Sequence, residues 1–176
     1  QAERRLSAEY KQHLKQKYKY VLDMPIRLKP GQRPKYRMIH VCDHEDGCFL
    51  MAENMQRRKD ELFVNIQQNG QLSLFNMMST VTSTVENDIL TQEEIEQMVL
   101  AHIHQMTRET HITVFLADFC NEYGVICPFK MIYEILTKLE NAGTIDIVRD
   151  PALTAAGKKR TFWAEKACLL YTSDAA

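Results

Sequence analysis

Pro128-Phe-Lys-Met-Ile-Tyr-Glu-Ile-Leu-Thr-Lys-Leu-Glu140 is the stretch that decides how the second half of this chain folds. Pro128 suits a helix start, because a helix leaves the N–H groups of its first turn without partners and proline has none to leave. Apolar residues then recur at helical spacing and predict an amphipathic helix, which Gly143 ends. They are Met131, Ile132, Ile135, Leu136 and Leu139.

A β-hairpin is predicted directly after this helix. Residues 144–149 and 161–165 read as two strands, and the tip between them carries Lys158, Lys159 and Arg160. A helix that leads into a basic hairpin is the layout of a winged helix-turn-helix. Two earlier helices would complete its core: residues 91–107, which begin with a Thr91/Glu94 capping box, and residues 115–123, which end at Gly124. The sequence therefore predicts a winged helix-turn-helix domain at residues 91–167.

The first part of the chain predicts a different, incomplete unit. Residues 1–16 read as the end of a helix. In residues 18–28 the side chains alternate, with Tyr18, Tyr20, Leu22 and Met24 on one face, which indicates a half-buried strand. A turn and a more buried strand at 36–42 follow, and then a helix. Because an isolated hairpin is marginally stable, residues 1–63 are predicted to be the last part of a larger α/β sheet. Residues 64–90 are predicted to be a linker, and the fold class is α+β.

One segment resembles a known family. Tyr36-Arg-Met-Ile-His-Val-Cys-Asp-His44, followed by Gly47 and Met51, is similar to the end of the methyltransferase-like domain in three-Cys-motif partner (TcmP) proteins. The resemblance implies a truncated class I methyltransferase-type fold followed by a winged-helix domain. It implies that the intact protein is an S-adenosylmethionine-dependent methyltransferase, and that its partner is a radical-SAM-like three-Cys-motif protein. No residue of this chain matches a cofactor-binding motif, so this part by itself is expected to be catalytically inactive.

The last nine residues, Cys168-Leu-Leu-Tyr-Thr-Ser-Asp-Ala-Ala176, resemble the in-frame translation of a sequencing adapter. Residues 168–176 are therefore expected to be a non-native tail, and the natural chain to be truncated at both ends. Neither a CxxC pair nor a long apolar run is present, and no signal peptide is recognisable. These features favour a reduced, cytoplasmic protein with no membrane segment.

Charge is distributed unevenly, although the net charge is −1. Residues 1–37 carry eleven Lys/Arg against three Asp/Glu, and residues 38–127 carry four against fourteen. The basic block is either a nucleic-acid surface or a solvated helix face and edge strand. In the predicted recognition helix, Lys130, Tyr133 and Thr137 are the outward residues placed to contact DNA or RNA, and Lys138 would reach only the phosphate backbone. Phe129 and Glu134 also point outward, and Glu134 would repel phosphate. Arg149 at the base of the wing, with Lys158, Lys159 and Arg160, would contact phosphates.

Three functions stay open at this point. The winged helix contacts nucleic acid and directs a methyltransferase-like domain, or it is a protein–protein docking module, or the chain is a transcriptional regulator. A metal site at His40, Cys42, His44 and Cys48 is disfavoured, because their spacing matches no common zinc pattern. No catalytic residue is predicted, and Cys127 is expected to be a buried or helix-capping residue.

Overall fold

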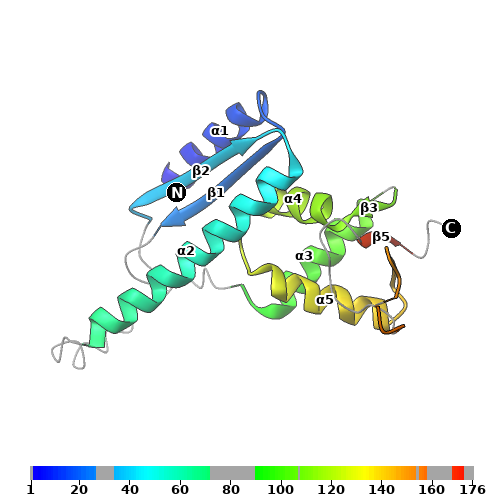
Figure 1. Ribbon diagram of the computed structural model, residues 1–176. Coiled ribbons are helices and arrows are strands. Elements are labelled where there is room, and N and C mark those ends of the chain that lie inside the picture. The colour runs from blue at the N-terminus through cyan, green and yellow to red at the C-terminus, as the bar shows by residue number, and fades with distance from the viewer. Residues whose placement is uncertain are drawn as a thin grey trace.

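The computed structural model describes residues 2–26, 34–71, 90–106, 108–153, 155–157 and 168–172. Helices and strands are mixed, as the sequence predicts for an α+β protein (Figure 1). Among the described helices, none combines the length and the apolar character needed to cross a bilayer. In chain order the elements are α1 (Ala2–Lys15), β1 (Tyr20–Ile26), β2 (Tyr36–Cys42), α2 (Glu45–Gln71), α3 (Gln92–His104), β3 (Thr110–His111), α4 (Ile112–Tyr123), α5 (Phe129–Asn141), β4 (Ile145–Arg149) and β5 (Cys168–Thr172).

The predicted strand pair near the N-terminus is confirmed. β1 and β2 run antiparallel, with Tyr20 opposite Cys42 and Ile26 opposite Tyr36. The alternation in β1 buries Tyr20, Leu22 and Met24, which belong to the core. α1 lies on one face of this sheet and α2 packs against the sheet and α4 (Figure 1).

The two edges of this sheet differ. At the outer edge of β1, the Val21 N–H donates to Asn121 Oδ1 at 3.0 Å, and Asn121 Nδ2 donates to the carbonyl of Lys19 at 3.3 Å. The amide of Asn121, from α4, thus takes the place of a neighbouring strand. β2 has no such cover within the described part of the chain, where it pairs with β1 alone.

α2 is longer than the sequence predicts. The predicted boundary between an α/β remnant and a linker, at residues 63 and 64, falls inside this helix, which continues to Gln71. An apolar run as short as residues 62–66 does not distinguish strand from helix, and the preceding Gln, Arg, Lys and Glu residues are good helix formers. Residues 64–71, predicted to begin the linker, therefore continue the helix. The C-terminal end of α2 projects away from the rest of the molecule (Figure 1).

The second sheet has the strand order β3-β5-β4, and the central β5 is antiparallel to both neighbours. The predicted wing strand at 161–165 lies outside the described residues, and β4 pairs with residues 168–172 instead. This differs from the expectation that residues 168–176 lie outside the fold. The run Cys-Leu-Leu-Tyr-Thr is apolar and ends in β-favouring residues, which suits a strand that is paired on both edges. The adapter resemblance concerns the origin of these residues and stays a prediction.

Both halves of the chain share one hydrophobic core. The ring of Phe49, from α2, stacks on that of Phe129, from α5, with centroids 4.8 Å apart. Cys48 Sγ donates to the carbonyl of Ala117 in α4 at 3.7 Å. Because α4 packs against both β1 and α2, residues 2–26 and 34–62 are packed on the C-terminal helices and do not form a separate body. Buried residues of the predicted remnant and of the predicted winged helix thus belong to one cluster, and the division into two domains stays a prediction.

Candidate functional site

The outward face of α5 is the nucleic-acid surface that the sequence predicts, and most of its polar groups already have partners. Lys138 Nζ donates to both carboxylate oxygens of Glu96, at 2.7 and 2.8 Å. The hydroxyl of Thr137 donates to the carbonyl of Tyr133 at 2.7 Å. Lys130 is the most exposed of the set, with 87% of its side chain accessible, and its ammonium lies 3.9 Å from Glu134. Carboxylates therefore neutralise much of this face.

Arg149 is a correction to the sequence analysis. The sequence predicts a phosphate contact for it at the base of the wing, but only 6% of the residue is accessible. Its guanidinium donates to both carboxylate oxygens of Glu140, at 2.6 and 2.7 Å. A buried guanidinium needs a bidentate carboxylate acceptor of this kind, because an uncompensated charge in the interior is costly. Arg149 thus joins β4 to the end of α5 and is not presented to a phosphate. Lys158, Lys159 and Arg160 lie outside the described residues.

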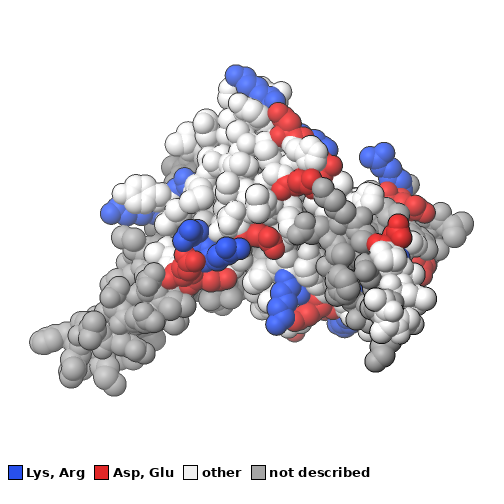
Figure 2. Space-filling view, viewed as in Figure 1, with Lys and Arg blue, Asp and Glu red and all other residues white. Residues whose placement is uncertain are grey.

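The first turn of α5 faces protein. Phe129, predicted to point outward, is buried against Phe49 of α2. Helical periodicity places Phe129 off the α5 stripe, and only the presence of α2 explains its burial. A cavity of about 380 Å³ lies between the two helices, where Arg57 and Asp60 of α2 meet Lys130 and Tyr133. The end of α5 that would enter a DNA groove is therefore next to α2. On the face in Figure 2, basic and acidic side chains are interspersed.

An apolar groove beside β2 was missed by the sequence analysis. It has a volume of about 420 Å³ and lies between α1 and β2. Leu6 and Tyr36 on its walls are 70% and 61% accessible, and Tyr10 is also exposed. Two residues that line the groove, Ser7 and Arg37, donate hydrogen bonds to the carboxylate of Asp23 in β1. The stripe of Leu6 and Tyr10 was recognised as one helical face, but the sequence cannot show that this face lacks a cover.

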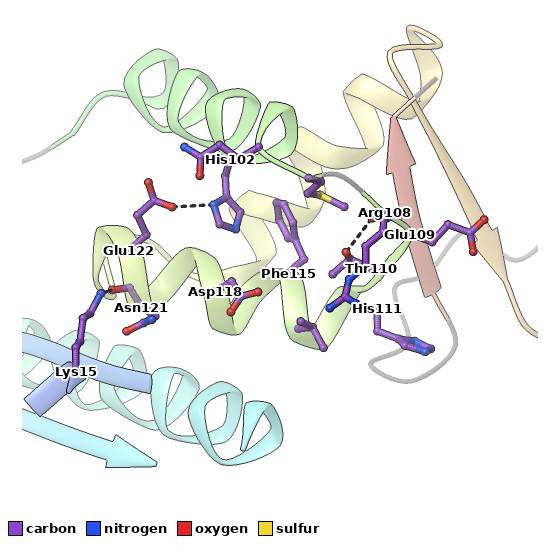
Figure 3. Close-up of a pocket in the computed structure, with 13 residues that line it drawn as sticks. Lys15, His102, Arg108, Glu109, Thr110, His111, Phe115, Asp118, Asn121 and Glu122 are labelled. Carbon is purple, nitrogen blue, oxygen red and sulfur yellow. Dashed lines mark hydrogen bonds and ion pairs between the residues drawn. The ribbon is translucent and has the colours of Figure 1, made fainter. Parts of the chain in front are cut away.

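A cavity of about 690 Å³ runs along α4 (Figure 3). His102 extends into it from α3, and its Nδ1 lies 3.0 Å from Glu122 Oε2. Lys15 from α1 and Arg108 from the α3–β3 connection also line it, together with Asp118 of α4. In the sequence, His102 follows Ile95, Met98 and Val99 at helical spacing, which predicts a core residue on the apolar face of its helix. It is buried as predicted, but it also lines this polar cleft.

Cys42, Cys48, Cys120 and Cys127 are free thiols and differ in exposure. Burial raises the pKa of Cys48 to about 12 and that of Cys127 to about 11, and it also raises the pKa of Cys120. Cys42 is half-buried, and burial raises its pKa as well. The position of Cys127 just before a helix does not lower its pKa, because removal from water outweighs the helix dipole.

These pKa values predict an order of thiol reactivity. Because the thiolate is the nucleophile, a raised pKa lowers the reactive fraction at any given pH. At pH 8, iodoacetamide should modify Cys42 first, while Cys48, Cys120 and Cys127 react at least about tenfold more slowly. Peptide mass spectrometry after timed quenching measures this order. Denaturant should equalise the four rates, and rapid labelling of Cys48 in the folded protein would contradict the prediction.

Within the described ranges, no group of three or more His, Cys, Asp or Glu side chains is placed to hold a metal ion. His40, Cys42, His44 and Cys48 do not converge there. Comparison with known proteins finds no matching family model, no matching curated protein and no matching solved structure.

Proposed function

We propose that this chain is a protein-docking module, in which a half of winged-helix type is packed against the end of an α/β sheet with an open strand edge. The observation that carries the proposal is the apolar groove beside β2, walled by the exposed Leu6, Tyr10 and Tyr36. Exposed apolar patches on soluble domains typically mark protein-binding surfaces, and tyrosine is enriched in them.

The strand edge defines how a partner would bind. An unpaired strand presents a row of N–H and C=O groups that a second strand can satisfy. Asn121 occupies the start of the β1 edge, at Lys19 and Val21, and among the described residues β2 pairs with β1 alone, so β2 is the edge at which the sheet would grow. A partner strand added to β2 would bring side chains next to Tyr36 and Met38, both exposed. Main-chain hydrogen bonds would then supply affinity, and the groove would supply specificity.

The resemblance to three-Cys-motif partner proteins supports two identities for the added strand. It is a strand of the methyltransferase-like sheet whose end this segment resembles, or a strand of a radical-SAM-like three-Cys-motif protein. S-adenosylmethionine, by the same resemblance, belongs to the intact protein. The winged-helix assignment is supported by the order α3, β3, α4, α5, β4, β5, in which the last strand is central in the sheet.

Substitutions at the β2 edge test the docking proposal. The probe is a three-Cys-motif protein encoded in the same genome, titrated into the chain by isothermal calorimetry. A lysine on an edge strand blocks strand addition, so Met38→Lys should weaken binding at least about tenfold. Leu50→Lys is the matched control, because Leu50 is an exposed apolar residue on α2 that does not line the groove. Equal binding by the two variants, or no binding by the wild-type chain, overturns docking of a three-Cys-motif protein at the β2 edge.

Nucleic-acid contact is a second candidate, favoured by the exposed Lys130 at the first turn of a helix in a winged-helix arrangement. The sequence predicts four wing cations on phosphates, which gives a log–log salt slope of about −4. With Arg149 bonded to Glu140, three remain, and the expected slope is about −3. Fluorescence anisotropy of a labelled duplex, titrated at several salt concentrations, measures this slope. Binding that does not change with salt, or no binding at tens of micromolar protein, removes this candidate.

A further inference from the structure

The cleft along α4 is built from groups that the docking proposal does not use. Its floor is one face of α4, where Asp118 and Glu122 lie one helical turn apart. His102 of α3 forms one wall, and Lys15 of α1 and Arg108 lie toward its two ends (Figure 3). The residues that line the cleft thus come from separate parts of the chain and are brought together by folding.

His102 is the central group of the cleft. It is 8% accessible, and three aromatic rings pack edge-on against its imidazole. Its Nδ1 is bonded to the carboxylate of Glu122, which can only accept, so Nδ1 carries the proton. In the neutral ring, Nε2 then carries a lone pair. No described group donates to that atom, and an acceptor is therefore available at a residue more than nine-tenths buried.

Asp118 adds a negative charge to the same cleft. Its side chain is half-buried and forms no hydrogen bond or ion pair with other described residues, whereas Lys15 at one end already donates to the carbonyl of Asn121 at 3.0 Å. The middle of the cleft therefore holds Asp118, the second oxygen of Glu122 and Nε2 of His102. All three accept hydrogen bonds, and two carry negative charge when His102 is neutral.

We propose that this cleft binds a guanidinium or primary ammonium group, which donates to Asp118 and His102. Charge-assisted hydrogen bonds of this kind are about twice as strong as neutral ones. A metal ion is a poorer match, because no three ligating side chains among the described residues converge on one point. A guanidinium presents five N–H donors spread over a plane, so it reaches acceptors that are farther apart.

The group can belong to a free amine or to an arginine side chain of a protein, and two probes separate these sources. Agmatine is a free guanidinium–amine, and a capped Gly-Arg-Gly peptide presents the same group on a polypeptide. Each is titrated into the full chain up to about 10 mM and followed by ¹H–¹⁵N correlation spectra. Binding should shift the amides of α4 and the connection at residues 108–110. Long-range imidazole spectra should show a moved Nε2 resonance and a retained Nδ1–H.

Asp118→Asn tests the charge without removing an internal bond, since the side chain forms none with the described residues. It should weaken probe binding at least about tenfold, because it removes the anion that a charge-assisted bond needs. Glu122→Gln should also weaken binding while keeping an acceptor for His102. Glu93→Gln, at the first turn of α3 and outside the cleft, should change the affinity less than about twofold. The proposal fails if neither probe shifts the cleft, or if Asp118→Asn binds as Glu93→Gln does.

Discussion

Replacing Glu140 with alanine should lower the free energy of unfolding by about 3–5 kcal/mol. The carboxylate of Glu140 accepts a bidentate pair of hydrogen bonds from Arg149, whose guanidinium is almost fully buried between α5 and β4. Removing the acceptor leaves a cation in the interior without its main counter-charge. The resulting loss of stability exceeds the stabilisation that an exposed ion pair provides. Urea denaturation followed by circular dichroism measures the change.

A double variant isolates the cause. Glu140→Ala with Arg149→Met removes both charges, and a buried pair replaced by apolar side chains is often neutral in stability. The double variant should therefore recover most of the loss seen in Glu140→Ala alone. If Arg149 were instead an exposed wing residue, Glu140→Ala would cost less than about 1 kcal/mol, and Arg149→Met would add nothing further.

Truncating Phe49 to alanine is expected to have a comparable effect, a loss of about 3–5 kcal/mol. Phe49 is buried and stacked on Phe129, so its removal opens a cavity at the contact between α2 and α5. Leu50→Ala is the control at the next position of the same helix. Leu50 is exposed, and its truncation should change stability by less than about 0.5 kcal/mol.

The number of transitions in the unfolding curve tests whether the two halves of the chain unfold together. Because the two halves share one core, the amide NMR signals of β1 and those of α5 should be lost in one transition, in the wild type and in Phe49→Ala. Two resolved transitions would show that residues 2–26 and 34–62 unfold apart from the C-terminal helices. That outcome would restore the two-domain division that the sequence predicts.

Local signals in the sequence predicted local structure well. The Thr91/Glu94 capping box is present in full, with the Glu94 N–H donating to Thr91 and the Thr91 N–H donating to Glu94. Gly124 ends α4 with a φ of 83°, a backbone conformation that favours glycine. Each of these features depends on groups within a few residues of one another. The chain therefore encodes them without reference to the rest of the fold.

Features that depend on distant contacts were not predictable in this way. Phe129 lies off the apolar stripe of α5, and it is buried because α2 crosses that helix. Arg149 looked like a surface cation, but Glu140, nine positions earlier, draws it into the interior. The cleft at His102 needs side chains from α1, α3 and α4. Spacing along one element gives the face of a side chain, and only the packing of elements shows what covers that face.

The amide of Asn121 has a consequence for aggregation. A fibril that grows by edge-to-edge pairing needs two free strand edges on every molecule, one at each end. In the sheet of β1 and β2, Asn121 occupies one of the two through its bonds to Val21 and Lys19. Edge pairing through this sheet therefore stops after a single addition. One asparagine on a helix thus lets β2 stay an open edge without open-ended polymerisation through this sheet.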